Sequence, residues 1–593
     1  MHWAATLLIY GSFRPAISNG HTVPRWSDKT KISSIVGLRA APYEPKVKLA
    51  GDRSRLHNAN GQLCLKLFTF PTSRRLGMGD TGHEKRRHDP TQKGLPAGTV
   101  GLLGATVIGI SCVAPGYTLA AALGPIVAKV GAQTPAIILL GFVPMLFVAL
   151  AYRELNRAMP DSGTAFTWVT RAFGPWIGWL TGWGLVASTV LVLSNTAGVA
   201  VDFFYLMIAQ ITRHPEVAHL TENAGLNIST CLVFMALATW ISYRGMAATK
   251  AFQYVLVGIQ VVVLAVYSVV ALVKVSNGTA YDPTPVRLAW FNPLEISSAS
   301  AVAAGLSLSI FIAWGWDVTL AMNEETKGSR TTPGQAATTT VLSTVLLYVL
   351  ASAASIAFAG LGKGALGLGN PHIQVNAFLG LAGPVLGGFA LLMSLAVLSS
   401  SAASLQATII NPSRTLLAMG HYDALPAALA KISPRYGTPS VAIFTSTFVS
   451  SAFYAVMRAV SQHMLWDTVS ALGIMICFYY SFTALAAVWY FRKQWFKSRS
   501  NFMNQFVFPL LGGISLAALF FRTLSDSLDP GFGSGSQVGG IGLVFIIGMG
   551  IIALGVILML ITAVFKPAFF RGERLSVSAF NGTENQCFDE HPI

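Results

Sequence analysis

The sequence predicts an all-α polytopic membrane protein with about twelve transmembrane helices. Hydrophobic residues make up 53% of the 593 residues, charged residues only 11%, and the mean hydropathy is +0.57. A soluble globular chain carries roughly 25% charged residues, so this chain has too little charge to cover a water-facing surface. From Val100 onward it is a series of apolar runs near the length of about 20 residues that a membrane-spanning helix needs. Two of these runs contain helix-breaking residues near their centres.

Twelve candidate spans follow one another along the chain. They lie near residues 99–124, 134–153, 174–209, 227–243, 250–274, 298–323, 336–362, 383–417, 440–460, 464–491, 506–523 and 540–565. The third and the eighth are long enough to be broken or strongly tilted. With both termini in the cytoplasm, 17 basic residues fall in cytoplasmic connections and 7 on the opposite side, as the positive-inside rule requires. We therefore expect a multi-pass protein of the plasma (inner) membrane, embedded in the lipid bilayer with both termini cytoplasmic.

The first 97 residues differ from the rest of the chain. They are polar and aperiodic, with 16 Lys and Arg against 6 Asp and Glu, and this composition predicts a disordered cytoplasmic tail. A natural start at Met78 is an alternative, since every span would survive without residues 1–77. Residues 98–567 form the predicted transmembrane domain, and residues 568–593 a short cytoplasmic tail. The net charge of +16 does not indicate a nucleic acid partner, because a basic patch interleaved with aromatic residues is absent from the sequence.

The first and sixth spans are interrupted near their centres. The first contains Pro115 followed by Gly116, and the sixth contains Gly315 close to the carboxylate of Asp317. Non-helical backbone in a bilayer persists only where protein or a cavity satisfies its polar groups. If the first ten spans form two sets of five, these two spans occupy matching positions, which is a pointer to the substrate site of a transporter. The alternative is that proline and glycine merely kink both helices.

An interrupted helix offers a small charged molecule two kinds of contact. Unpaired N–H groups face it where one half begins, and unpaired C=O groups where the other half ends. The first end carries positive partial charge and the second negative. One end can hold a carboxylate and the other an ammonium group, which is what a zwitterionic amino acid needs.

Three stretches of the chain carry a resemblance to a known family. Residues 152–178 read YREL…MPDSGTAFTW…RAFGPWIG, similar to its P-x-x-G-G-x-Y … R-x-x-G-P-x-x-G pattern at the start of helix 3. Residues 314–333 contain WGWD, NEETK and a proline, similar to F-x-G-F-E … E-E-x-K-N-P … P of helix 6 and its cytoplasmic loop. Residues 413–439 contain SR, ALP, AK and TP, similar to the end of helix 8 and its loop. In this order, the stretches resemble bacterial amino acid permeases of the amino acid–polyamine–organocation (APC) superfamily, over residues 100–565.

This resemblance implies a five-plus-five inverted repeat with broken helices 1 and 6, plus two C-terminal helices. It also implies a secondary active transporter that moves an amino acid or related amine by alternating access, through proton-coupled symport or exchange, without a cofactor. A membrane amino acid sensor that binds without net transport is the alternative. An enzyme is disfavoured because the sequence shows no catalytic or metal-binding cluster, and a channel because it shows no ring of repeated polar residues.

The resemblance places the substrate-binding residues of helix 1 at the first break. They are Val113, Ala114, Gly116 and Tyr117, and the N–H groups of the last two would bind a substrate carboxylate. Pro115 departs from the Gly-Ser/Ala-Gly pattern of the family and has no N–H. One expected donor is therefore missing, which weakens the case for a plain α-amino acid.

On helix 6 the resemblance covers four consecutive residues. Ala313 and Trp314 would offer carbonyl groups to a substrate amine, and Gly315 is the point of interruption. The aromatic gate of the family falls on Trp314 or Trp316. Core packing is the alternative role for both tryptophans.

Three residues are candidates for ion coupling, to protons or to sodium. Asp317 occupies the glutamate position of the family, and a carboxylate within the membrane is costly enough to suggest a function; it would relay protons or hold helix 6 to a neighbour. Gln260 occupies the position of a lysine found in some members, and a glutamine does not titrate. Ser400 lies where a related sodium site takes hydroxyl ligands, and close helix packing is its alternative role.

Two further groups of polar residues have predicted roles. Gln406 and Tyr480 are candidates for selectivity toward the substrate side chain. Glu324 and Glu325, together with Arg153 and Arg171, would form a cytoplasmic gate of ion pairs that breaks on inward opening. Solvated loop charge is the alternative. The substrate, the coupling ion and the oligomeric state stay open at this point.

Overall fold

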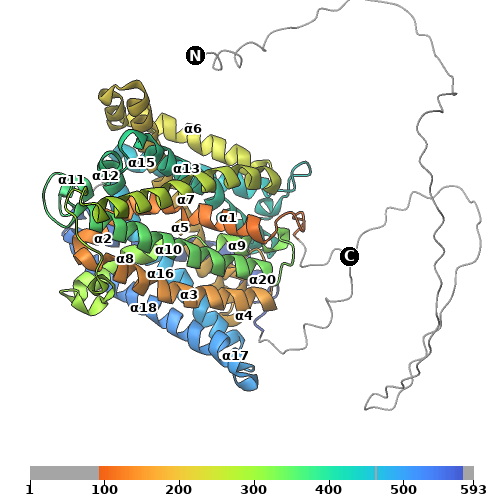
Figure 1. Ribbon diagram of the computed structural model, residues 1–593. Coiled ribbons are helices and arrows are strands. Elements are labelled where there is room, and N and C mark those ends of the chain that lie inside the picture. Colours follow the sequence, from red (N-terminus) through yellow and green to blue (C-terminus); the bar gives the residue numbers. More distant parts are fainter. Residues whose placement is uncertain (1–92, 375, 461–463, 579–593) are drawn as a thin grey trace, which may run out of the picture. The chain divides into compact units, whose positions relative to one another are not determined.

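The computed structural model describes residues 93–374, 376–460 and 464–578 of the chain. This part is a bundle of helices that run roughly alongside one another (Figure 1). Residues 1–92, with the alternative start at Met78, lie outside the described residues, as do residues 579–593. The predicted all-α class is confirmed, because β-structure in the described part is confined to one short hairpin and an isolated bridge.

The α-helices and strands follow in chain order. They are α1 (Leu102–Val113), α2 (Pro115–Val130), α3 (Thr134–Ala158), α4 (Ala165–Phe173), α5 (Pro175–Thr212), α6 (Ala224–Tyr243), α7 (Met246–Ser276), α8 (Ala299–Ile312), α9 (Val318–Ala321), α10 (Thr332–Ala359), α11 (Pro371–Gln374), α12 (Ala377–Leu386), α13 (Leu391–Thr408), α14 (Ile410–His421), α15 (Ser440–Val460), α16 (Met464–Tyr490), α17 (Arg499–Asn501), α18 (Phe508–Asp526), β1 (Gln537–Val538), β2 (Ile541–Gly542), α19 (Leu543–Phe565) and α20 (Pro567–Phe570). A short 3₁₀ turn, η5 (Asn323–Glu325), follows α9.

Ten helical stretches of the described residues are long and apolar enough to cross a membrane. One of them, Leu102–Ala158, has 57 residues and runs through α1, α2 and α3. At 1.5 Å per residue it would measure roughly 85 Å, against about 30 Å of hydrocarbon, so it contains the first and second predicted spans. The sixth predicted span is missing from the ten because its break leaves α8 only 14 residues long. When Leu102–Ala158 is counted as two spans and the broken sixth span is added, the ten stretches account for the twelve predicted spans.

The two spans predicted to be long behave differently. The third is α5, an unbroken helix of 38 residues. The eighth is broken near its start, which is one of the two alternatives expected for it: α12 ends at Leu386 and the long stretch begins at Leu391. Gly387 separates them with a φ of 59°, a left-handed conformation that glycine adopts without steric cost and that ends a helix. Hydropathy did not reveal this end because the residues around it are apolar.

Two ends of the helical part are named here by their residues. The Lys93 face holds the start of α1, the loop between α3 and α4, η5 and the end of α14, which are joined by side-chain contacts. The Lys129 face holds the end of α2 and α11, and together with α8 from Ala304 onward they line one cavity. The broken helices run between these two faces.

The packed part of the chain extends beyond both predicted boundaries of the transmembrane domain. At one end the side chain of Lys93 is fully buried. At the other, Phe569 is buried and stacks on Phe166, and Ser578 N–H donates to the Arg171 carbonyl at 2.9 Å. Composition predicted the boundaries at 97/98 and 567/568 because the segments just outside them are short and polar or close to the chain ends. Contacts with specific partners, which composition does not show, hold both segments in the packed part.

Candidate functional site

The first break lies between α1 and α2. Ala114 adopts the left-handed conformation, with φ 54° and ψ 63°, which costs a non-glycine residue roughly 1–3 kcal/mol. Pro115 then begins α2, where its missing N–H and fixed φ suit the first helical position. The interruption predicted around Pro115 is present, and it is a strained turn between two separate helices.

The second break separates α8 from α9 over residues 313–317. Gly315 has a φ of 105°, in a region that side chains rarely tolerate. A Cβ atom there would lie 3.0 Å from the carbonyl C and O atoms of Cys112 and 3.1 Å from the backbone N of Val113. The two interruptions therefore touch through their backbones.

The start of α2 is capped by side chains from two neighbouring helices. Gly116 N–H donates to Gln260 Oε1 of α7 at 3.5 Å. Tyr117 N–H donates to Ser400 Oγ of α13 at 3.1 Å. The structure thus brings Gln260 and Ser400 to the first break, but it corrects the expectation that these two N–H groups are free. A substrate carboxylate would have to share or replace the two acceptors.

The end of α8 keeps carbonyl groups available. The Ile312 carbonyl accepts from Tyr348 OH at 2.8 Å, and this hydroxyl lies 2.7 Å from Thr118 Oγ1. Within the described residues, no donor contacts the carbonyl oxygens of Ala313 and Trp314. Carbonyls at a helix C-terminus carry negative partial charge, so these two suit an ammonium group, as the sequence predicts.

Asp317 is buried in a polar cluster beside the second break. Asn411 Nδ2 of α14 donates to Asp317 Oδ2 at 3.1 Å, and Tyr479 OH of α16 donates to the same oxygen at 3.4 Å. Trp314 Nε1 donates to Tyr479 OH at 2.5 Å. In the described part of the chain, no cationic side chain forms an ion pair with Asp317. Its surroundings accommodate both roles left open by the sequence, proton exchange and attachment of the broken helix to α14 and α16.

Trp316 and Tyr480 lie against each other. Their rings stack with centroids 5.2 Å apart, and Tyr152 meets both edge-on. Trp316 is fully buried, yet its Nε1–H has no acceptor among the described residues. The aromatic cluster therefore packs like a core while it retains a polar hydrogen for a water or a ligand.

Gln406 belongs to a separate polar cluster. Its Nε2 donates to Ser242 Oγ at 3.3 Å and to Thr249 Oγ1 at 2.8 Å, and its Oε1 accepts from Gln253. It lies six residues after Ser400, roughly 9 Å along α13 toward the Lys93 face. The structure therefore does not place its amide at the breaks, where the sequence suggested a selectivity role.

A cavity of about 480 Å³ opens on the Lys129 face. Its lining includes Lys129 of α2, Gln374 of α11 and Ser534 before β1, and it reaches Phe311 of α8. Phe311 meets Tyr117 edge-on, with ring centroids 6.4 Å apart. An aromatic pair thus stands between this cavity and the start of α2.

Sequence reasoning did not single out Phe311, which lines the cavity and contacts Tyr117. It assigned the aromatic gate to Trp314 or Trp316, both of which are buried in aromatic or polar clusters. The available signal was spacing, because Phe311 lies one helical turn before Gly315 and is an aromatic residue on the last turn of α8.

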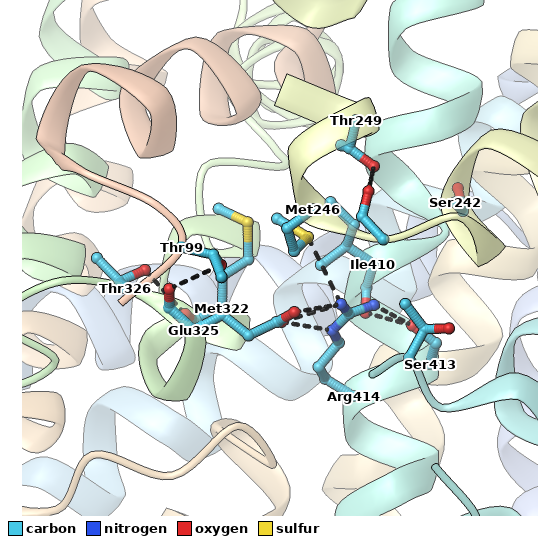
Figure 2. Close-up of polar contacts among 12 residues, drawn as sticks. Thr99, Ser242, Met246, Thr249, Met322, Glu325, Thr326, Ile410, Ser413 and Arg414 are labelled. Atoms are coloured by element: carbon cyan, nitrogen blue, oxygen red, sulfur yellow. Dashed lines mark hydrogen bonds and ion pairs between the residues drawn. The ribbon is translucent and has the colours of Figure 1, made fainter. Parts of the chain in front are cut away.

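The acidic residues predicted for a gate have partners other than those predicted. Figure 2 shows the carboxylate of Glu325 facing the guanidinium of Arg414, which donates three hydrogen bonds to it at 2.9–3.1 Å. Both side chains are buried. Glu324 accepts instead from Lys93 Nζ at 2.6 Å.

The two arginines predicted for the gate lie elsewhere. Arg153 is 3.6 Å from Glu154 and donates to Asn504, and Arg171 donates to the Ser576 carbonyl. The prediction was wrong about the cations because loop charge does not show which partners the fold brings together.

Fold and site together define a membrane protein of packed helices in which two broken helices meet at their backbones. The profile of the amino acid permease family matches residues 100–527, from the start of α1 to the end of α18. The chain belongs to this family, which confirms the predicted resemblance and the prediction of a permease in place of an enzyme.

The relatives are named for different substrates. The branched-chain amino acid permease BcaP of Lactococcus lactis subsp. cremoris is 25% identical over 320 residues, which cover 51% of this chain and 64% of the relative. BcaP of Bacillus subtilis is 25% identical over 308 residues, covering 50% and 62%. The low-affinity putrescine importer PlaP of Escherichia coli K12 is 20% identical over 439 residues, covering 73% and 90%. The chain thus matches just under two thirds of the length of either BcaP.

Proposed function

We propose that the protein is a secondary transporter that carries an amino acid or a related amine by alternating access around the two breaks. The observation that carries this proposal is the backbone contact of Gly315 with Cys112 and Val113, in a chain of the permease family. Paired discontinuous helices form the midplane substrate sites of secondary transporters.

An amine group is the best supported feature of the substrate. The carbonyls of Ala313 and Trp314 are available to it, whereas the N–H groups of Gly116 and Tyr117 already have acceptors. One relative is named for branched-chain amino acids and another for putrescine, and both kinds of compound carry an amine group. The substrate class is therefore amine-bearing, with or without a carboxylate.

The Lys93 face is proposed to face the cytoplasm, with both termini on that side of the plasma membrane. The excess of basic residues in the connections on that side supports this orientation. The cavity beside Lys129 would then open to the outside, while buried ion pairs of Lys93 and Arg414 close the inner side. In these terms the protein is in an outward-facing conformation.

Counterflow in liposomes tests transport directly. Purified protein is first screened by thermal shift against amino acids and polyamines, at two pH values and with or without sodium. The best ligand is then loaded unlabelled into proteoliposomes, and uptake of the radiolabelled compound is followed. We expect transient accumulation above that of protein-free liposomes. Stabilisation without accumulation would favour the sensor alternative, and no stabilisation by any amine-bearing ligand would contradict the substrate class.

A further inference from the structure

A short segment before α1, residues 93–100, crosses the Lys93 face and is named the strap here. Val100 N–H donates to the Glu325 carbonyl at 3.1 Å, and Lys327 N–H donates to the Val100 carbonyl at 2.8 Å. Thr99 Oγ1 also donates to the Glu325 carbonyl, at 3.2 Å (Figure 2). The strap is therefore hydrogen-bonded to η5 and to Lys327 just beyond it. η5 follows α9, the second half of the second broken helix.

At the other end of the strap, Lys93 lies between two carboxylates. Its Nζ is 2.8 Å from Asp161 Oδ2 and 2.6 Å from Glu324 Oε1, and its side chain is 0% exposed. Tyr422, just after α14, donates its hydroxyl to Asp161 Oδ2 at 2.5 Å, and its ring centroid is 5.4 Å from Lys93 Nζ. Ser162 N–H donates to Glu324 Oε1 at 3.0 Å. One cation thus joins the strap to three other segments.

The charges in this cluster depend on one another. A buried ammonium group is tolerated only with ionised or strongly polar partners, and a buried carboxylate needs a cation in the same way. The side chain of Asp161 is 8% exposed and that of Glu324 is 16% exposed, so both carboxylates are largely shielded from water. Without Lys93, the carboxylates of Asp161 and Glu324 would remain close together and unpaired. Separation of the α3–α4 loop from η5, with entry of water, is the change that relieves this repulsion.

We propose that Lys93 is the positioning residue that keeps the Lys93 face closed, and that its release from Asp161 and Glu324 is a necessary step in opening that face. Glu324 belongs to η5, directly after α9, so movement of the broken helix acts on this contact first. The consequence for transport rests on the proposed function, whereas closure of the face itself does not.

The thiol of Cys112 reports opening without any substrate. It lies in α1 between the break and the Lys93 face, is 2% exposed, and is 3.5 Å from Thr408 Oγ1 of α13. Labelling therefore requires α1 and α13 to separate. The full chain, with every other cysteine replaced by alanine, is reconstituted in liposomes and treated with N-ethylmaleimide. Lys93→Met is expected to raise the labelling rate of Cys112 by about tenfold or more, because loss of one partner strands buried charges.

Two controls separate opening from general damage. Lys566 forms an ion pair of 2.6 Å with Asp423, but both side chains are partly exposed, so Lys566→Met is expected to change the rate by less than about twofold. A second sensor keeps only Cys477 of α16, which is 1% exposed. Its labelling is expected to be the same in wild type and Lys93→Met.

Glu324→Gln provides a second route to the same state. It removes one carboxylate of the cluster and is expected to raise Cys112 labelling as well, and its effect should not add to that of Lys93→Met, because the two residues share one interaction. Unchanged Cys112 labelling in both single variants overturns the proposal. If Lys93→Met also exposes Cys477, Glu324→Gln decides: faster labelling confined to Cys112 supports the proposal, and any other result overturns it. Because the assay contains no substrate, its outcome is independent of a failure in counterflow.

Discussion

Gly315 meets two independent requirements at a single position. Its φ of 105° disfavours any side chain, and the backbone of Cys112 lies only 3.0 Å from the position of a Cβ atom. Ala114 illustrates the opposite case, a left-handed residue that keeps its methyl group in a fully buried site. The contact between the two broken helices thus depends on one glycine.

Gly315→Ala is expected to destabilise the folded protein by roughly 1–3 kcal/mol from the backbone conformation alone, with an added cost from the contact with Cys112. Thermal unfolding in detergent measures this as a lower midpoint than wild type. Gly258→Ala on α7 is the matched control, since no atom lies within 4 Å of the added methyl group, and an alanine in a helix interior is neutral or slightly stabilising. Equal midpoints for the two variants would be incompatible with the described contact.

At the scale of elements, the strap acquires its position from partners outside itself. Burial by itself lowers the pKa of Lys93, but Asp161 and Glu324 outweigh it and hold the pKa above its usual value of 10.5. Burial likewise raises the pKa of Asp161, and Lys93 outweighs it, so that this pKa lies below its usual value of 3.8. The ion pair therefore forms part of the stability of the Lys93 face throughout the neutral range.

The stabilisation by this pair has a defined pH window. The contribution of Asp161 is present above its usual pKa and lost as the pH falls further, whereas that of Lys93 is present below 10.5 and lost as the pH rises further. Glu324, Tyr422 and Arg171 are the other titratable or charged groups around the pair. The difference in unfolding temperature between wild type and Lys93→Met should be constant from about pH 5 to pH 9 and shrink below about pH 4. Thermal scans at constant ionic strength measure this difference, and a steep change near neutral pH would argue against the ion pair.

On the scale of the whole molecule, the cavity and the ion pairs lie on opposite faces, and the same broken helices run from one face to the other. The cavity reaches Phe311 on α8, while Glu324 and Glu325 follow α9. Asp317 lies between these halves and attaches the break to α14 and α16 through Asn411 and Tyr479. A change of charge at this carboxylate would thus act on both halves of the helix.

Asp317→Asn is expected to abolish the pH dependence of uptake while exchange of substrate for substrate continues, because an amide keeps the hydrogen-bonding site but cannot take up a proton. Uptake at two external pH values and exchange at equal pH are compared in proteoliposomes. Glu573→Gln, which alters an exposed carboxylate after α20, is the control and should keep the wild-type profile. Retained pH dependence in Asp317→Asn would exclude this residue as the coupling group.

Much of the fold follows from local properties of the sequence. The membrane spans were predictable because hydropathy and helix length act within about 20 residues. Pro115 and Gly315 marked the two breaks because a missing N–H or a missing side chain alters the backbone at that position. The start of the helix in the eighth predicted span was not predictable in this way, because an apolar run continues across the turn at Gly387.

The candidate site was only partly predictable. Gln260 and Ser400 were found through a family resemblance, yet their role as caps of Gly116 and Tyr117 depends on the packing of α7 and α13 against α2. Gln406 has the right chemistry for a site, but it bonds to other helices. A polar residue on an apolar helix shows that a partner exists without showing which one.

The sequence by itself determined that this chain is a helical membrane protein interrupted at two points, because hydropathy and backbone constraints are properties of neighbouring residues. Only the tertiary structure decided that the breaks touch, that Phe311 borders the cavity, and that Lys93 and Arg414 pair with Glu324 and Glu325. Those contacts join residues that are 89 to 231 positions apart in the chain for the two ion pairs. Charges at such separations meet only when packed helices place them together and exclude the water that would otherwise solvate each one.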